Sequence, residues 1–207
     1  MNDKLLNIKT ESLQKSPYES HHYNRYEPTP YEVLDRLFEC IELERTESVV
    51  DFGCGSGRLN FYIHYRFQSA VMGVEMNDYL YGQALENRKN YLSKHTDTSQ
   101  QVQFENCLAQ NYSIKPEENV FYFFNPFSVQ IFKAVVNNIL QSLEETNREI
   151  QIILYYAPED YIFFLENQTA FLLAKEIILP GNAYEKLLIY SFGIPSKRMP
   201  FKWKNIV

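Results

Sequence analysis

The sequence has no apolar run close to the roughly 18–20 residues that a membrane-spanning helix needs, so a membrane partner is not expected. Its first residues, MNDKLLNIKTESLQKS, lack the apolar stretch and cleavage site of a secretory signal, which makes the cytoplasm the expected location. Cysteine is scarce too, because Cys40, Cys54 and Cys107 lie far apart without histidine or cysteine neighbours at ligand spacing. A disulfide framework is therefore disfavoured, and no metal site is expected.

An excess of basic residues is also missing. Lysine and arginine number 20 against 26 aspartates and glutamates, which leaves a net charge of −6. Because nucleic acids are bound mainly through their phosphates, this charge disfavours duplex nucleic acid as a partner. One basic stretch, KRMPFKWK from Lys197 to Lys204, could contact an anionic acceptor or RNA. A tail that packs its aromatic side chains on the domain is the simpler interpretation.

What the sequence does contain is typical of a globular protein. Hydrophobic residues make up 45% and charged residues 22% of its 207 positions, a length that suits one domain over 1–207. Within it we expect an N-terminal helical lid segment at 1–45 and an α/β core at 46–207. The lid segment should hold a weak helix in residues 1–16 and an amphipathic helix at Pro30–Leu43. The Tyr- and His-rich stretch between them, bounded by prolines, is typical of a binding loop.

Short β-rich runs alternate with amphipathic segments from Ser48 onward, which predicts βαβ units and a mainly parallel sheet. Helices are predicted at Asp78–Lys94 and Ser128–Leu143, each starting at a residue suited to an N-cap. The last two strands are separated by Pro180-Gly181-Asn182, too short for a crossover helix, and must pair antiparallel. The predicted strands are Ser48–Phe52, Ala70–Glu75, Gln101–Asn106, Asn119–Asn125, Ile150–Tyr156, Phe171–Leu179 and Leu187–Phe192.

The strongest motif is VVDFGCGSGRLNFYI, in which an apolar strand ends at Asp51 and passes through three alternate glycines into a helix. These glycines indicate a sharp turn at Gly53, close approach of a ligand at Gly55 and close strand–helix packing at Gly57. Their spacing differs from the dinucleotide fingerprint, and no lysine followed by serine or threonine forms a phosphate loop. A nicotinamide-dependent oxidoreductase is therefore disfavoured.

Polar side chains follow the next predicted strands. The second strand ends at Glu75, where nucleotide-binding α/β proteins place a carboxylate that accepts hydrogen bonds from a ribose diol. The third ends at Asn106-Cys107, where an amide can hydrogen-bond adenine, and the fourth at Asn125-Pro126-Phe127. Since ligands bind at the carboxyl ends of parallel strands, these groups should converge on one nucleoside.

From about Tyr26 to Phe192 the sequence resembles the class I S-adenosylmethionine-dependent methyltransferases. The loop from Asp51 to Gly57 is similar to their first motif, Glu75 to their ribose-binding acidic residue, and the two later Asn motifs to their adenine-contacting and post-strand-four positions. The resemblance implies a Rossmann-like seven-stranded sheet in the order 3-2-1-4-5-7-6, with the last strand antiparallel and helices on both faces. It implies S-adenosyl-L-methionine as cofactor, bound by Asp51, Gly53, Cys54, Gly55, Gly57, Glu75, Met76, Asn106, Cys107 and Asn125.

The same resemblance implies acceptor-positioning roles for Asn125, the Pro126 carbonyl and Phe127. In amine-methylating members this motif reads Asn or Asp, Pro, Pro, aromatic, and the second proline is missing here. Many members also have Asp where this chain has Asn106, which can still donate and accept. A nitrogen acceptor on a small molecule or a protein is thus favoured. Tyrosines of the N-terminal segment are expected to close over the site; they are Tyr23, Tyr26 and Tyr31.

Several alternatives stay open at this stage. The chain could methylate an amino group of an RNA or DNA base, or bind an adenosyl group without catalysis. The motif at Asn125 could be a simple turn with Phe127 in the core. A general base could come from His21, His22 or the neighbourhood of Glu75. The sequence names neither the acceptor nor the oligomeric state.

Overall fold

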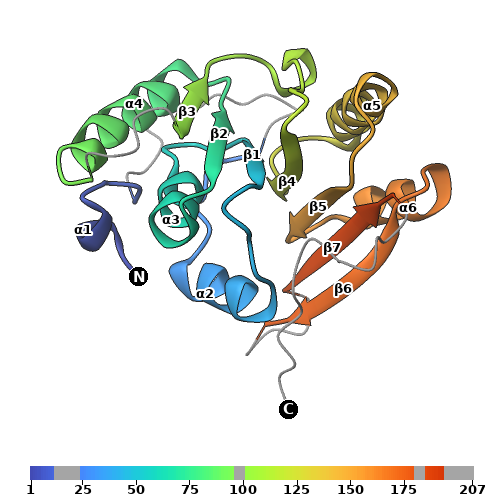
Figure 1. Cartoon of the computed structure of the whole chain (residues 1–207), viewed down its shortest axis with the longest axis horizontal. Coiled ribbons are helices and arrows are strands. Elements are labelled where there is room, and N and C mark those ends of the chain that lie inside the picture. Colours follow the sequence, from blue (N-terminus) through green and yellow to red (C-terminus); the bar gives the residue numbers. More distant parts are fainter. Residues whose placement is uncertain (12–23, 96–100, 180–184, 194–207) are drawn as a thin grey trace.

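The computed structural model describes residues 1–11, 24–95, 101–179 and 185–193, which form one sheet of seven strands with helices on both faces (Figure 1). The strands are β1 (Ser48–Phe52), β2 (Ala70–Val74), β3 (Val102–Glu105), β4 (Glu118–Phe124), β5 (Ile150–Tyr155), β6 (Leu172–Ile178) and β7 (Lys186–Phe192). The helices are α1 (Asp3–Leu6), α2 (Tyr31–Cys40), α3 (Arg58–Phe67), α4 (Asp78–Leu92), α5 (Val129–Glu145) and α6 (Glu159–Gln168), with a 3-10 helix, η1 (Ala109–Asn111). None of these helices is long and apolar enough to cross a membrane.

The strand order is β3-β2-β1-β4-β5-β7-β6, which confirms the order expected from the sequence. Neighbouring strands from β3 to β5 pair parallel, and β7 pairs antiparallel with both β5 and β6. In the register, Asp51 of β1 lies opposite Gly73 of β2 and Tyr122 of β4. The carboxyl ends of β1, β2 and β4 therefore meet at one edge of the sheet.

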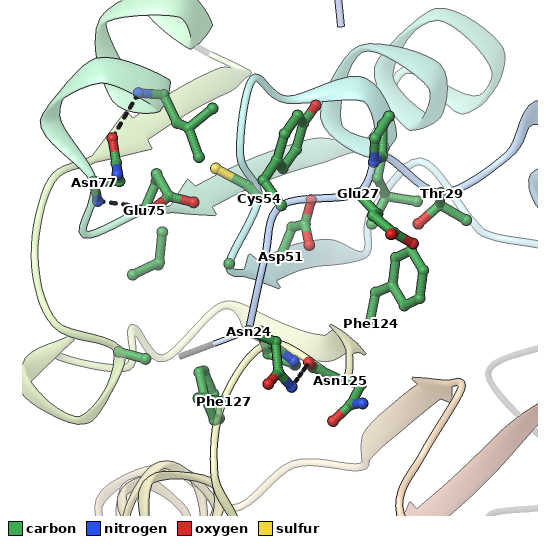
Figure 2. A pocket seen from close by; sticks show the side chains of 18 of the residues that line it. Asn24, Glu27, Thr29, Asp51, Cys54, Glu75, Asn77, Phe124, Asn125 and Phe127 are labelled. Atoms are coloured by element: carbon green, nitrogen blue, oxygen red, sulfur yellow. Dashed lines mark hydrogen bonds between the residues drawn. The ribbon is translucent and has the colours of Figure 1, made fainter. Parts of the chain in front are cut away.

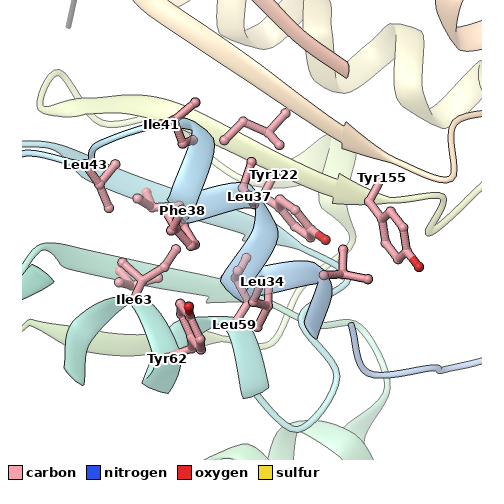
Figure 3. Packing of buried hydrophobic residues seen from close by; sticks show 14 of the residues in the cluster. Leu34, Leu37, Phe38, Ile41, Leu43, Leu59, Tyr62, Ile63, Tyr122 and Tyr155 are labelled. Atoms are coloured by element: carbon pink, nitrogen blue, oxygen red, sulfur yellow. The ribbon is translucent and has the colours of Figure 1, made fainter. Parts of the chain in front are cut away.

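Successive strand residues face opposite sides of the sheet and build two apolar cores. On β1, Val49 belongs to the core that includes α2 and α3, whereas Val50 and Phe52 belong to the core that includes α5 and α6. Figure 3 shows the first core, where Leu34 and Leu37 of α2 pack among side chains of α3 and the sheet. The helix α2 is therefore part of the core, and among the described residues of the lid expected over 1–45 the irregular stretch 24–29 lines the site.

The predicted strand bounds agree with the structure to within one residue at each end. The turn Pro180-Gly181-Asn182 and the basic stretch from Lys197 to Lys204 lie outside the described residues. One helix cap differs from the prediction, because Asn77 and not Asp78 caps α4. The side chain of Asn77 accepts hydrogen bonds from two backbone N–H groups of the first turn.

Two N-terminal helices are shorter than predicted. The weak helix expected in 1–16 is only α1, because Asn7 adopts a left-handed conformation with φ of 58° and ends it, while residues 12–16 lie outside the described chain. The helix expected at Pro30–Leu43 ends at Cys40. Ile41 is extended, with φ of −130°, and is fully buried, so the chain leaves the helix to fill the core.

Glu47, in the turn before β1, makes stability depend on pH. Its Oε2 accepts a hydrogen bond from the Glu44 backbone N–H at 2.7 Å, while its buried Oε1 has no partner in the described part of the chain. Burial, aided by the charge of Glu44, raises the pKa of Glu47 from 4.5 to about 7. Because the folded-state pKa is raised, protonated Glu47 favours folding at low pH, and this contribution is lost as the pH rises through about 7.

We expect Glu47→Gln to raise the free energy of unfolding by about 2 kcal/mol at pH 8 and to change it little at pH 5. Urea unfolding at both pH values measures the effect. Glu42→Gln, at an exposed position of the same segment, is the matched control and should be neutral at both. An equal effect of Glu47→Gln at pH 5 and pH 8 would show that this carboxyl is not the titrating group.

Candidate functional site

A cavity of about 300 Å³ opens at the carboxyl ends of β1, β2 and β4 (Figure 2). Most of the side chains that the sequence singled out line it: Asp51, Gly53, Cys54, Glu75, Met76, Cys107, Asn125, Pro126 and Phe127. Gly55, Gly57 and Asn106 do not line it. The exposed Asn106 instead donates its side-chain N–H to the backbone oxygen of Glu75 at 3.0 Å. The convergence of four strand ends on one cavity is the arrangement that the parallel sheet predicts.

The carboxylate of Glu75 is held rigidly at the cavity wall. Its Oε2 accepts a hydrogen bond from the Gly55 N–H at 2.9 Å, and its Oε1 accepts one from the Asn77 N–H at 2.8 Å. Burial raises the pKa of Glu75, and these backbone hydrogen bonds oppose that shift. Each carboxylate oxygen has a second lone pair, so Glu75 can still accept hydrogen bonds from two hydroxyl groups of a ligand.

Asp51 is a second buried carboxyl in the same cavity, with only 5% of its surface exposed. When the Asn60 amide is oriented to satisfy both its atoms, it donates to Asp51 Oδ2 at 3.0 Å and accepts from the Gly73 N–H at 3.2 Å. Burial, and after it the charge of Glu75, raises the pKa of Asp51 well above its usual range. Two carboxyls that are costly to ionise together favour a ligand that brings positive charge.

The three glycines of the loop make room for protein groups. A Cβ on Gly53 would lie 2.6 Å from the Cβ of Pro126, and one on Gly57 would lie 2.7 Å from the ring of Phe104. A Cβ on Gly55 would lie 1.9 Å from the ring of Tyr26. The sequence predicted that Gly55 makes room for the ligand, but the space beside it holds Tyr26.

Gly55→Ala should therefore displace Tyr26 and strain the loop, since residue 55 has a φ of +55°. We expect the free energy of unfolding to fall by about 2–4 kcal/mol. Gly82→Ala is the matched control, because Gly82 lies in α4 with nothing within 4 Å of an added Cβ. That variant should gain up to about 1 kcal/mol from helix propensity. Equal effects of the two substitutions in urea unfolding would contradict the contact with Tyr26.

The segment 24–29 forms a wall of the cavity that the sequence only partly foresaw. The Asn24 N–H donates to the Pro126 carbonyl at 3.0 Å, and its side chain donates to the Asn125 carbonyl at 2.7 Å (Figure 2). Farther along, Thr29 Oγ1 and the Tyr122 hydroxyl are 2.9 Å apart. The proline-bounded, tyrosine-rich composition was the available signal, but nothing in it identified Asn24 or Thr29 as the contacting residues.

Tyrosines of the N-terminal segment take different positions. Tyr26 lines the cavity, and its hydroxyl lies 2.6 Å from Ser56 Oγ. Burial raises its pKa to about 12. Tyr31 does not close over the site: it is buried, donates to Asp3 Oδ1 at 2.5 Å and lies under a guanidinium. Tyr23, and with it His21 and His22, lies outside the described residues.

Arg58, at the start of α3, anchors the chain around this wall. Its Nε donates to Thr10 Oγ1 at 2.7 Å and its Nη1 to the Thr29 carbonyl at 3.3 Å. It also forms ion pairs with Asp3 and Glu11, both at 3.6 Å. One buried cation thus connects the first residues of the chain, segment 24–29 and the helix that follows the glycine loop.

Asn125 and Phe127, in the motif after β4, have different structural roles. Asn125 adopts a left-handed backbone conformation with φ of 38°, which turns the chain at the cavity edge. Phe127 lines the cavity and yet is only 2% exposed, with its ring packed edge-on against Phe123 at 6.1 Å. Most of the Phe127 side chain is therefore buried, as the alternative of a core residue predicts.

The two cysteines near the cavity are not poised as nucleophiles. Burial raises the pKa of the Cys54 thiol well above its usual range. Burial, with the nearby Glu105, raises the pKa of Cys107 to about 11. Thiols that stay protonated at neutral pH pack as small apolar groups.

Residues 29–124 match a family described as "Methyltransferase domain". The match covers 96 of the 207 residues. In this range the chain is similar to a methyltransferase domain, and its strand order is the one implied by the resemblance to the class I S-adenosylmethionine-dependent methyltransferases. The matched range contains the glycine loop, Glu75 and all of β1 to β4.

Named methyltransferases are similar to this chain in sequence or in fold. A protein-lysine N-methyltransferase of Saccharolobus islandicus (strain REY15A) is 36% identical over 63 residues, which span 30% of this chain and 39% of that protein. An RNA methyltransferase from Salinibacter ruber, in complex with S-adenosyl-L-homocysteine, has a TM-score of 0.55 at 19% identity, covering 82% of this chain and 97% of its own. A precorrin-6y C5,15-methyltransferase from Geobacter metallireducens GS-15 has a TM-score of 0.59 at 14% identity, covering 82% and 92%.

Proposed function

We propose that this methyltransferase binds S-adenosylmethionine in the cavity and transfers its methyl group to a nitrogen atom of a small molecule or a protein. The observation that carries the proposal is the pair of buried carboxyls, Asp51 and Glu75, beside the glycine loop in one cavity of about 300 Å³. The domain family supports the chemistry, and the partial similarity to a protein-lysine N-methyltransferase supports nitrogen as the acceptor.

The residues of the cavity fit this cofactor. Glu75 offers carboxylate lone pairs that suit a ribose diol, and Asp51 offers negative charge that suits a sulfonium and an ammonium group. Leu80 and Ala109 give the cavity apolar surface of the kind an adenine ring packs against. A cavity of this volume lies at the lower end of the range of small-molecule sites, about 300–1,000 Å³.

When bound, S-adenosylmethionine supplies an electrophilic methyl carbon on a positively charged sulfur. The protein then has to align the acceptor nitrogen with that carbon and exclude water. Asn125 and Tyr122 lie where β4 meets the cavity, on the side opposite Glu75, and segment 24–29 covers them. These residues hold the acceptor and shield it from water. No acid or base of the protein has to bond to the acceptor during the transfer.

An amino group of an RNA base is the second candidate function, since the Salinibacter ruber relative in fold methylates RNA. At 19% identity, this similarity supports only a shared fold. The net charge of −6 disfavours a polyanionic acceptor. We therefore place amines of small molecules or proteins first.

Methyl transfer from labelled S-adenosylmethionine to a lysine-rich peptide, a set of small amines and unmethylated RNA tests the proposal. We expect transfer to the peptide or the amines, with kcat about tenfold lower for Asn125→Ala and an unchanged affinity for S-adenosylhomocysteine. Asn147→Ala, at an exposed position after α5, is the matched control. Cofactor binding with no transfer to any acceptor would support the non-catalytic alternative, and transfer to RNA alone would overturn the choice of acceptor.

A further inference from the structure

The cavity has two halves, one on each side of β1. Because β1 lies between β2 and β4 in the sheet, the ends of β2 and β3 with Glu75 and Cys107 form one side. The ends of β4 and β5 with segment 24–29 form the other. We call this other side the acceptor half; its lining side chains include Glu27, Tyr122, Phe124, Asn125 and Tyr156.

Aromatic rings dominate the acceptor half. Phe124 lies at the end of β4, with its ring centroid 4.4 Å from that of Tyr155. Tyr156 follows β5 and is 53% exposed although it lines the cavity. Its backbone has a φ of +53°, a strained conformation for a bulky residue. Strain of this kind is kept at ligand sites, so the placement of Tyr156 at the cavity mouth is itself an indication of binding.

The charged side chains of segment 24–29 on this side are Arg25 and Glu27, both exposed. The Glu27 carboxylate is exposed and points toward the side of the cavity where Phe124 lies (Figure 2). The pKa of Tyr155 is raised mainly by burial. The hydrogen bond to Glu185, the charge of Glu185 and then the charge of Glu27 raise it further. The negative field of Glu27 therefore reaches the end of β5. Of the two arginines that line the cavity, Arg58 is committed to Asp3 and Glu11, and Arg25 is exposed.

A planar amine would make different demands on the acceptor half. The exocyclic amine of a nucleobase has two N–H groups in the ring plane, and both need acceptors when they are buried. The carbonyls of Asn125 and Pro126 each accept one hydrogen bond from Asn24, at 2.7 and 3.0 Å, and each keeps one lone pair. An ammonium group, by contrast, brings the positive charge that the Glu27 carboxylate favours. A base acceptor is therefore an outcome that the test below separates from an ammonium.

We propose that Glu27, Phe124 and Tyr156 form a subsite for a primary alkylammonium group on a flexible aliphatic chain, such as a lysine side chain. The inference rests on the proposed methyl transfer at the same cavity. A carboxylate beside aromatic faces attracts a cation through charge and through the ring quadrupole.

The chemistry of this acceptor balances without a further reactant. The ammonium loses one proton to water at the open mouth of the cavity, where Glu27 is exposed. The neutral nitrogen then forms a bond to the methyl carbon while the carbon–sulfur bond breaks and its electron pair remains on sulfur. The products are a methylammonium group, which keeps the positive charge at the subsite, and neutral S-adenosylhomocysteine.

The test compares n-butylammonium with 1-butanol, an uncharged molecule of the same size, by NMR titration of the protein saturated with S-adenosylhomocysteine. We expect the ammonium to bind at least tenfold more tightly than the alcohol. Glu27→Gln should lower the affinity for the ammonium about tenfold and leave that for the alcohol unchanged. Tyr156→Asn should lower the affinity for the ammonium severalfold and leave that for the alcohol unchanged. Asparagine tolerates the left-handed backbone conformation of residue 156 and removes the aromatic ring. Glu32→Gln, exposed on α2 and outside the cavity, is the matched control.

Each outcome decides between the claims. Equal binding of ammonium and alcohol, or a Glu27→Gln variant that behaves like Glu32→Gln, would overturn the subsite and leave the cofactor site intact. Tighter binding of adenosine than of n-butylammonium to the saturated protein would overturn it in favour of a base acceptor. Failure of S-adenosylhomocysteine to bind would remove the proposed function, and the subsite with it.

Discussion

Glu75→Ala is expected to weaken the binding of S-adenosylhomocysteine by about 100-fold or more. The substitution removes the acceptor for two ribose hydroxyls, each charge-assisted hydrogen bond being worth about 1.5–3 kcal/mol. It also leaves the backbone N–H groups of Gly55 and Asn77 without the carboxylate that holds them at 2.9 and 2.8 Å. The glycine loop and the start of α4 should therefore loosen together, which adds to the loss. Isothermal titration calorimetry measures the affinity.

The control for this prediction is Glu86→Ala, which removes the same charge from an exposed position on α4. Its affinity should equal that of the wild type. Because Glu75→Ala also removes the acceptor of the Gly55 and Asn77 N–H groups, urea unfolding of the variant shows how much of the lost affinity comes from lost stability. An affinity for Glu75→Ala within threefold of the wild type would place the ribose elsewhere.

Arg58→Met is expected to lower the free energy of unfolding by about 3–5 kcal/mol, the usual cost of breaking a buried charge pair from one side. The variant loses ion pairs to Asp3 and Glu11 and hydrogen bonds to Thr10 and Thr29. It also loses the contact of the guanidinium with the Tyr31 ring, 4.6 Å from its centroid. Methionine fills part of the volume, so the expected effect comes from the polar contacts and not from a cavity.

Arg36→Met provides the matched comparison. Arg36 is 38% exposed on α2 and, among the residues that the structure describes, forms an ion pair with Glu39 at 3.3 Å, so its loss should cost less than about 0.5 kcal/mol. Urea unfolding of both variants, with proteolysis at segment 24–29 as a second readout, measures the difference. Similar values for the two variants would mean that Arg58 does not secure the N-terminal segment.

The strands of the sheet were predictable from the sequence because their signals are local, while their order was implied by the family resemblance. Each strand is a short β-rich run, and the alternation with helices leaves few topologies for a right-handed parallel sheet. The helix ends were less predictable. Asn77 and Asp78 both suit an N-cap, and only the backbone geometry selects Asn77. Ile41 continues a helical pattern in sequence, yet burial against the core draws it into an extended conformation.

The cavity residues at strand ends could be predicted from the sequence, whereas most of those from irregular segments could not. Asp51 lies near the end of β1, Glu75 follows β2 and Asn125 follows β4, so strand ends and residue types were enough to place them. Asn24, Glu27 and Tyr156 come from irregular segments, and their positions depend on tertiary contacts far along the chain. The role of Gly55 shows the same limit, because the glycine pattern signalled a close approach but not that Tyr26 makes it.

The central claim is that the cavity beside Glu75 binds S-adenosylmethionine, and calorimetric titration of the wild-type protein tests it most directly. The account predicts one equivalent of S-adenosylmethionine or S-adenosylhomocysteine bound with a micromolar dissociation constant, together with a higher unfolding temperature in the presence of either. No heat of binding and no shift in the unfolding temperature at millimolar ligand would contradict the claim and leave the cavity without its proposed cofactor.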